Sequence, residues 1–173
     1  MDSITRRSMI DRMKGAAKLD ADSYEEVEAD SGATGQAAGV VVLVAVAQGI
    51  GAAGFGAVGL IGGAVAALLG WLLWAGVTYL IGDKLLGGTA TWGELLRTIG
   101  FAQTPGLFMI LAFVPVIGVV VAVAVSIWVL IAGVIAIRQA LDFSTGKAVA
   151  TAILGWLAIA IPRVILGIGS GAA

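Results

Sequence analysis

The sequence has 173 residues, of which 60% are hydrophobic and 12% are charged, with a mean hydropathy of +1.05 and a net charge of −1. A soluble domain carries about 25% charged residues, so the composition excludes an ordinary soluble protein and favours a chain solvated by lipid. The sequence contains neither His nor Cys, which excludes imidazole and thiolate metal ligands, cysteine nucleophiles and a Ser-His-Asp triad. We expect no cofactor, no metal site and no bound nucleic acid.

The first 35 residues carry most of the charged side chains and are predicted to form a cytoplasmic segment of short helices. A helix over residues 3–19 places Ile10, Met13 and Ala17 along one side and basic residues along another. This pattern suits a helix that lies on an anionic membrane surface.

Further along this segment, Ser23-Tyr-Glu-Glu26 fits a capping box, in which a Ser hydroxyl and a Glu carboxylate each pair with a backbone N–H at a helix start. The short acidic helix that it opens, YEEVEAD, is interpreted either as a solvated helix face or as a partner-docking surface. The candidate docking residues here are Tyr24, Glu25, Glu26 and Glu28.

Two blocks without any charged residue follow, 52 residues from Ser31 to Gly82 and 40 residues from Thr98 to Ile137. About 20 apolar residues cross a bilayer core of about 30 Å, so each block holds two crossings and a turn. A third apolar run after Lys147 gives a fifth crossing. Helices are the expected form, because backbone polar groups in hydrocarbon must pair within their own element. We place the spans at 37–57, 61–82, 94–114, 118–138 and 146–166, within an all-α transmembrane domain of residues 36–173.

The basic residues set the predicted orientation. With the N-terminus inside, nine of the ten basic residues lie on the cytoplasmic side and only Arg163 lies outside, as the positive-inside rule expects. The same orientation places all eleven acidic residues inside. The chain is therefore predicted to be a multi-pass protein of the cytoplasmic membrane, with its C-terminus outside.

The connection between the second and third spans is rich in local signals. Gly87 and Gly88 end the preceding helix, and Thr91 to Glu94 fits a second capping box. Pro105 removes an intrahelical hydrogen bond and clashes with the preceding turn, so we predict a kink or break there, with a bent helix that acts as a gate as the alternative. The candidate docking residues of this connection are Asp83, Lys84, Glu94 and Arg97.

The second span contains small residues four positions apart, which let membrane helices approach closely. A glycine-dense hairpin over 54–60 precedes it. The predicted helix-packing residues are Gly59, Gly63, Ala66 and Gly70.

Four tryptophans fall near the middle of predicted spans: Trp71, Trp74, Trp128 and Trp156. Because an indole N–H needs a partner in a dry environment, we expect these side chains inside the bundle or against another subunit. Packing is favoured over a cofactor box, since no other feature converges on them.

No ionisable residue is predicted at mid-membrane depth, where proton-coupled carriers and pumps keep theirs. The carboxylates that flank the spans lie at the cytoplasmic ends, each close in sequence to a basic residue. The predicted surface pairs are Asp83 with Lys84, Glu94 with Arg97, and Asp142 with Arg138.

Four stretches carry a family resemblance: RMKGAAKLDADSYEEVEAD, TGQAAGVVVLVAVAQGIGA, LLGGTATWGELLRTIGFAQTPGLF and FSTGKAVATAILGW. Together they resemble the bacterial and archaeal branch of the Ypt-interacting protein (Yip) domain family over nearly the whole chain. The resemblance implies five spans and a cytoplasmic N-terminus. Eukaryotic relatives are adaptors for prenylated small GTPases, but their Asp-Leu-Tyr-Gly-Pro signature is missing here, where the nearest text is Asp22-Ser-Tyr24-Glu. A small GTPase is therefore not the expected partner.

Two functional hypotheses from different classes follow. The first is a non-enzymatic scaffold, adaptor or accessory subunit that uses its N-terminal segment and the connection 83–97 to hold a partner. The alternative is a small channel or solute permease formed by oligomerisation, in which the glycine-rich hairpin and the bend at Pro105 line or gate a path. An intramembrane enzyme has the least support, because no nucleophile and base pair can be named. The expected partners are membrane lipids and other membrane proteins or a second copy of the chain.

Overall fold

In the computed structural model, which describes residues 7–51 and 57–165, every described element is a helix. The α-helices are α1 (Met9–Ala17), α2 (Ala21–Ala29), α3 (Thr34–Gly51), α4 (Ala57–Tyr79), α5 (Trp92–Ala102), α6 (Ile117–Ala140) and α7 (Thr145–Ile165). Three short helices of other types join them: the 3-10 helices η1 (Ser31–Ala33) and η3 (Thr104–Phe113) and the π-helix η2 (Leu80–Leu85). The predicted all-α fold class is confirmed.

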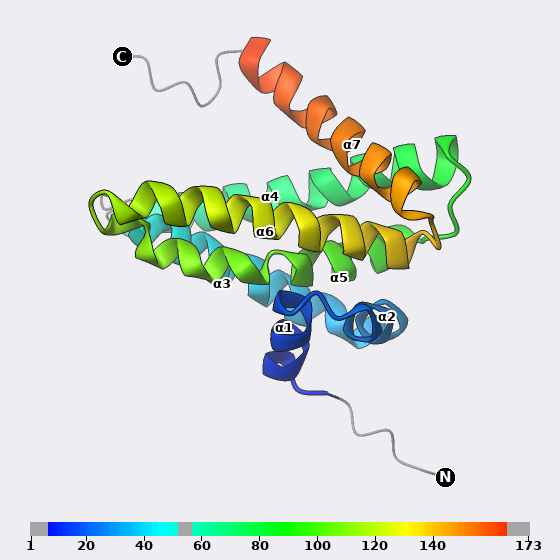
Figure 1. The fold of residues 1–173 in the computed structure, drawn as a ribbon, viewed down its shortest axis with the longest axis horizontal. Helices are drawn as coiled ribbons and strands as arrows, with labels where there is room; N and C mark the ends of the chain where they lie inside the picture. Colours follow the sequence, from blue (N-terminus) through cyan, green and yellow to red (C-terminus); the bar gives the residue numbers. More distant parts are fainter. Residues whose placement is uncertain (1–6, 52–56, 166–173) are drawn as a thin grey trace.

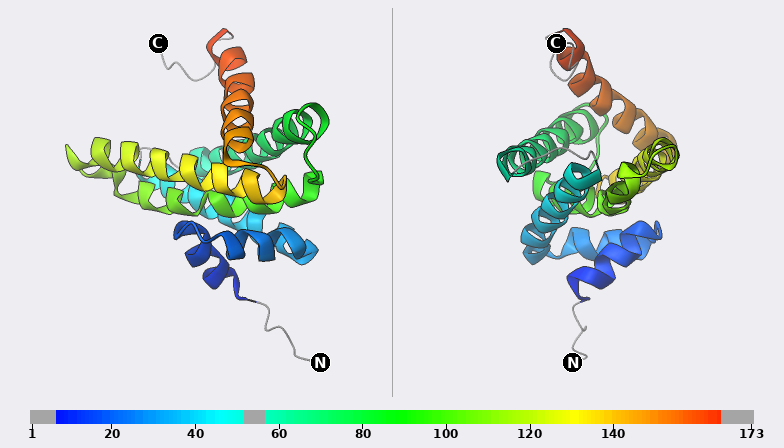
Figure 2. Two further views of the ribbon diagram at one scale, coloured as in Figure 1. Left: turned by 45° about the vertical axis from the view of Figure 1, so that its right-hand side comes forward. Right: turned by 90° about the vertical axis from the view of Figure 1, so that its left-hand side faces the viewer.

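The helices form three layers (Figure 1). The central bundle consists of α3, α4, α6 and α5 with η3, while α1 and α2 lie together against one flank and α7 leaves the opposite flank obliquely. Both views of Figure 2 show the same order of layers. The charged segment formed by α1 and α2, here called the N-terminal hairpin, is therefore packed on the bundle and is not a free tail.

Each of the five ranges predicted to span a membrane contains a helix among its described residues. Within the described residues, three helical segments are long and apolar enough to cross one: Ser31–Gly51 with 21 residues, Trp92–Phe113 with 22 and Ile117–Ala140 with 24. At a rise of about 1.5 Å per residue, α6 alone is about 36 Å long, which exceeds a bilayer core of about 30 Å.

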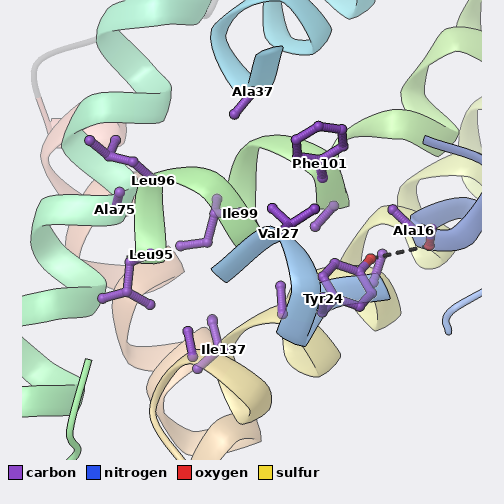
Figure 3. Packing of buried hydrophobic residues seen from close by; sticks show 14 of the residues in the cluster. Ala16, Tyr24, Val27, Ala37, Ala75, Leu95, Leu96, Ile99, Phe101 and Ile137 are labelled. Atoms are coloured by element: carbon purple, nitrogen blue, oxygen red, sulfur yellow. Dashed lines mark hydrogen bonds between the residues drawn. The ribbon is translucent and has the colours of Figure 1, made fainter. Parts of the chain in front are cut away.

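The helix α5 lies at the centre of the fold. Its residues from Leu95 to Ala102 are all buried, and α2, α3, α4 and α6 all pack against it. Gly100 allows the closest of these approaches, because a Cβ there would lie 2.7 Å from the Cβ of Ala37 in α3. Figure 3 shows where side chains from α2, α3, α5 and α6 meet: Val27, Ala37, Ile99 and Ile137.

The α-helical geometry of α5 ends at Ala102, three residues before Pro105, and the chain continues as the 3-10 helix η3. Proline has no N–H to donate, so the α-helical ladder loses a bond at this point. The hydroxyl of Thr104 donates to the carbonyl of Phe101 at 2.6 Å, which satisfies one carbonyl at the break. The third predicted span is thus an α-helix followed by a narrower helix.

Exposed apolar side chains gather on η3 and on the first two thirds of α6. From Ala132 onward the apolar side chains of α6 are buried or half-buried. A continuous apolar surface of this kind is stable against acyl chains and not against water, so the fold is that of a membrane protein. The exposed residues are Phe108, Ile110, Leu111 and Phe113 of η3, Val116, and Ile117, Val119, Val120, Val123, Ile127, Leu130 and Ile131 of α6.

Two of the four tryptophans have the predicted hydrogen-bond partners. Trp71 donates to the carbonyl of Leu96 at 3.0 Å, and Trp128 donates to the carbonyl of Ala17 in α1 at 2.8 Å. Trp74 packs against the core as predicted, but its buried Nε1 has no hydrogen-bond partner among the described residues. The side chain of Trp156 lies outside the described part of the structure.

The predicted apolar face of α1 is wrong at two of its three residues, each of which lies one position after the residue that is packed inward. Met9 and Met13 pack against the core and Ala16 is buried, whereas Ile10 is 62% exposed. The apolar face therefore covers the bundle and is not free to lie on a membrane.

The predicted capping box at Ser23 is also wrong. The helix α2 begins at Ala21 with Asp20 as its N-cap, and the hydroxyl of Ser23 donates to the carboxylate of Asp20 at 2.6 Å. The sequence signal was misleading because the turn that follows α1 at Leu19, with φ of 63°, starts the next helix three residues earlier than predicted.

The predicted packing residues of the second span all lie in α4. Gly70 is half-buried, while the surroundings of Gly59, Gly63 and Ala66 lie outside the described part of the chain. The hairpin predicted at 54–60 also falls partly outside it.

Candidate partner-docking surface

The guanidinium of Arg97 joins the N-terminal hairpin to the bundle. Arg97 lies in α5 with 8% of its surface exposed, and its Nε donates to the carbonyls of Val27 and Glu28 at 3.1 Å each. Its Nη2 also donates to the Glu28 carbonyl. These carbonyls belong to the last turn of α2, where backbone acceptors lack helical partners and the helix dipole favours a cation. Arg97 thus caps the C-terminus of α2 and fixes it on α5.

A second buried arginine organises the hairpin itself. Arg12 of α1 is 1% exposed, and it pairs with Glu26 at 3.0 Å and with Asp30 at 2.7 Å. Its Nη1 also donates to Oε1 of Gln36 in α3 at 3.0 Å. A buried cation requires this degree of pairing, since removal of its partners leaves an uncompensated charge. One side chain therefore ties α1, α2 and α3 together.

Tyr24 is completely buried between the hairpin and the bundle, and its hydroxyl donates to the carbonyl of Ala16 at 3.1 Å (Figure 3). Burial raises the pKa of this phenol above its usual value. Of the predicted docking residues, Tyr24, Glu26 and Arg97 are thus engaged in holding the hairpin in place.

Carboxylates from three segments lie close enough at this end to interact electrostatically with Glu28. Glu25 and Glu28 come from α2, Glu94 from the first turn of α5, and Asp142 from the turn after α6. Partial burial, together with the negative charges of Glu94, Asp142 and Glu25, raises the pKa of Glu28 to about 7. We call these four residues the acidic surface.

The individual contacts differ from the predicted surface pairs. Glu94 completes the predicted capping box with Thr91, which is confirmed by both of its hydrogen bonds, at 2.7 and 3.3 Å. Asp142 accepts a hydrogen bond from Thr89 at 2.9 Å. The predicted pairing of Glu94 with Arg97 is wrong, because Arg97 bonds to α2 instead. Among the described residues, Arg138 donates to Gln139 and has no ion pair with Asp142.

The predicted pair of Asp83 and Lys84 is present, at 2.8 Å, in the π-helix η2. The Lys84 ammonium also lies 5.0 Å from the centre of the Tyr79 ring. A π-helix is rare in proteins and is frequently found at functional sites.

The connection after η2 packs against the α6–α7 turn and the start of α7. Lys147 donates to the carbonyl of Leu86 at 3.3 Å. Leu141 fills the space beside two glycines, because a Cβ at Gly82 or Gly88 would lie within 2.5 Å of its methyl groups. These contacts, together with the hydrogen bond from Thr89, hold Asp142 at one edge of the acidic surface.

A hollow of about 320 Å³ in the hairpin is lined by charged residues of both signs. Arg7 donates to Ser23 at 2.7 Å and lies 3.7 Å from Asp20, so much of its charge is balanced locally. The lining residues are Arg7, Asp11, Lys14, Gly15, Lys18, Asp20 and Ser23.

Sequence reasoning missed Arg12 and Asp142 as organising residues. A signal for Arg12 was present, since it lies three residues after Met9 and four before Ala16 and so shares their helix face. No comparable signal existed for Asp142, whose place beside Glu28 depends on how α2 packs on α6.

Within the described residues, no group of three or more carboxylates is placed to hold a metal ion. Several charged side chains at this end join helices, and four form the acidic surface.

Comparison with known proteins agrees with the sequence and the fold. The model of the Yip1 domain matches residues 22–166, which covers the N-terminal hairpin from α2 onward and the bundle. No curated protein and no solved structure shows significant similarity to the chain. Because the match covers most of the sequence, the chain is a membrane protein that belongs to the Yip1 domain family.

Proposed function

We propose that this protein is a non-enzymatic scaffold or adaptor of the cytoplasmic membrane, and that its acidic surface docks a protein partner with a basic face. The observation that carries the proposal is the rigid attachment of the N-terminal hairpin by Arg12 and Arg97, both buried. A surface that is already ordered loses less conformational entropy on binding than a flexible tail does.

The proposed partner chemistry follows from charge. Four carboxylates from three chain segments lie near one another, and repulsion from Glu94, Asp142 and Glu25 adds to burial, the larger cause, in raising the pKa of Glu28. A basic partner relieves that repulsion and is steered to the site by it. Asp83 and Lys84 remain candidates for the edge of the same contact, since η2 leads into the connection that is latched beside Asp142.

The membrane arrangement in this proposal has five crossings, with the hairpin and the acidic surface in the cytoplasm and the C-terminus outside. This arrangement is supported by the distribution of basic residues and by the helices found within the five predicted spans. Because the sequence contains no cysteine, a single Lys84→Cys substitution makes a clean probe. An impermeant thiol reagent is expected to label it in inverted vesicles and not in intact cells. Labelling in intact cells contradicts the arrangement.

The docking role is tested by photocrosslinking in native membranes, with a photoreactive residue at Glu25, which is exposed. A discrete crosslinked protein is expected, and its yield is expected to fall when Glu28 and Glu94 are replaced by Gln and when salt is raised. Asp11→Asn is the matched control, because Asp11 is an exposed carboxylate on α1 that does not belong to the acidic surface. Equal loss in the control, or no discrete product at all, contradicts the proposal.

Transport by an oligomer is tested in a second preparation. Purified protein in proteoliposomes is expected to pass ions and small solutes no faster than empty vesicles do. Flux that depends on Pro105 favours the channel hypothesis over the scaffold.

A further inference from the structure

Two polar atoms on α4 are buried in the bundle without a partner among the described residues: Nε1 of Trp74 and Oγ1 of Thr78. Thr78 is 0% exposed. The two residues are four positions apart, so they lie one above the other on the same helix face. A buried polar group without a hydrogen bond destabilises a protein, and such groups are rare.

The two atoms converge on one point of α7. A Cβ built at Gly155 would lie 3.5 Å from Oγ1 of Thr78 and 3.6 Å from Nε1 of Trp74. The absence of a side chain at this one position therefore leaves room, about the size of a methyl group, beside both polar atoms.

The indole ring is oriented by α6. A Cβ at Gly133 would lie 3.2 Å from Cη2 of Trp74, so the benzene edge of the ring lies close against α6 while its Nε1 lies beside Gly155 of α7. The ring is therefore packed between α6 and α7.

The chemistry of these atoms defines the ligand. An indole N–H only donates a hydrogen bond, and a Thr hydroxyl both donates and accepts. A single oxygen that accepts from both is the complementary group, and the room beside Gly155 is suited to one such atom.

We propose that Trp74 and Thr78 of α4 and Gly155 of α7 form a binding site for one hydrogen-bond-accepting oxygen, supplied by a water molecule or by the ester carbonyl of a lipid. The site is independent of the acidic surface, which is formed by α2, α5 and the α6–α7 turn.

The test follows the indole N–H of Trp74 by NMR in full-length protein labelled with ¹⁵N and reconstituted in lipid nanodiscs, with Trp74→Phe to assign the signal. The wild-type proton is expected at the downfield shift of a hydrogen-bonded indole. Gly155→Ala fills the meeting point and is expected to move this signal upfield. Gly146→Ala, on the same helix with nothing within 4 Å of the added Cβ, is the matched control and is expected to leave it unchanged.

Thr78→Val provides a second variant that keeps the volume of the side chain and removes its hydroxyl. It is expected to shift the Trp74 signal while the other indole signals stay in place, which shows that the fold is intact. If the wild-type Trp74 proton has the shift of an indole without a partner, and neither variant moves it, the site does not exist.

The source of the oxygen is settled by changing the lipid. Replacing ester-linked by ether-linked phosphatidylcholine removes the carbonyl, so a changed Trp74 signal identifies lipid as the ligand. An unchanged signal that shows a cross-peak to water identifies water. A hydrogen-bonded Trp74 indole whose signal neither changes in ether-linked lipid nor shows a cross-peak to water overturns the proposed ligand.

Discussion

The charged end of the molecule and its apolar half are held together in different ways. At the charged end, buried arginines bond to carbonyls and carboxylates of neighbouring helices. In the apolar half, α3 and η3 meet through close backbone contact, and many side chains of η3 and α6 face outward. Hydrogen bonds specify one arrangement by direction and charge, whereas packing in lipid depends on shape, because acyl chains are as apolar as the side chains they contact.

The largest effect is expected from Arg12→Ala. It leaves Glu26 and Asp30 without their buried cation, which costs about 3–5 kcal/mol for such a pair. Hydrogen exchange of the α2 amides is expected to accelerate, while that of α6 is unchanged. Arg7→Ala is the control, because Arg7 is half exposed and its ion pairs are longer, at 3.4 and 3.7 Å. If the two variants have equal effects, the charged end is not held by Arg12.

Gly51→Ala tests the apolar half. A Cβ there would lie 1.9 Å from the backbone oxygen of Met109, so α3 must move away from η3 at a cost of about 1–3 kcal/mol. The midpoint temperature of unfolding in detergent is expected to fall. Gly35→Ala in the same helix has nothing within 4 Å of the new Cβ and is expected to be neutral or slightly stabilising. Wild-type stability of Gly51→Ala would show that close packing is unimportant here.

A substitution at Val116, at the tip of the apolar half, is expected to raise the unfolding temperature. Its φ of 69° and ψ of −52° are strained for a β-branched residue, and such strain costs about 1–3 kcal/mol. Val116→Gly relieves it but adds about 0.4–1 kcal/mol of chain entropy in the unfolded state. A small net rise in unfolding temperature is therefore expected, and a fall would show that the exposed Val116 side chain contributes to stability.

The smallest effect concerns pH at the charged end. The pKa of Glu28 is raised from 4.5 to about 7, mainly by burial, so the folded protein binds this proton more tightly than the unfolded chain does. The resulting stability is complete below pH 4.5 and is lost as the pH rises through 7. Opening of α2, measured by hydrogen exchange and corrected for intrinsic rates, is expected to increase between pH 6 and pH 8. Glu28→Gln is expected to remove this dependence and Glu25→Gln to preserve most of it.

The sequence predicted local features well where a short stretch contains the whole cause. The charge-free blocks located the helices of the bundle, and Thr91 with Glu94 predicted the start of α5. The capping box at Ser23 failed because an identical pattern occurs inside a helix whose start is set by the preceding turn. A local capping signal therefore predicts a helix start only where the preceding turn does not already set that start.

The sequence by itself determined that this chain is helical and suited to lipid, because composition and the length of apolar runs decide both. Tertiary structure decided what the polar residues do. Arg97 was predicted for docking and became a helix cap, and Trp74 was predicted to have a partner and has none among the described residues. The physical reason is that charge and hydrogen bonding act over a few ångströms, so their outcome depends on which helices meet.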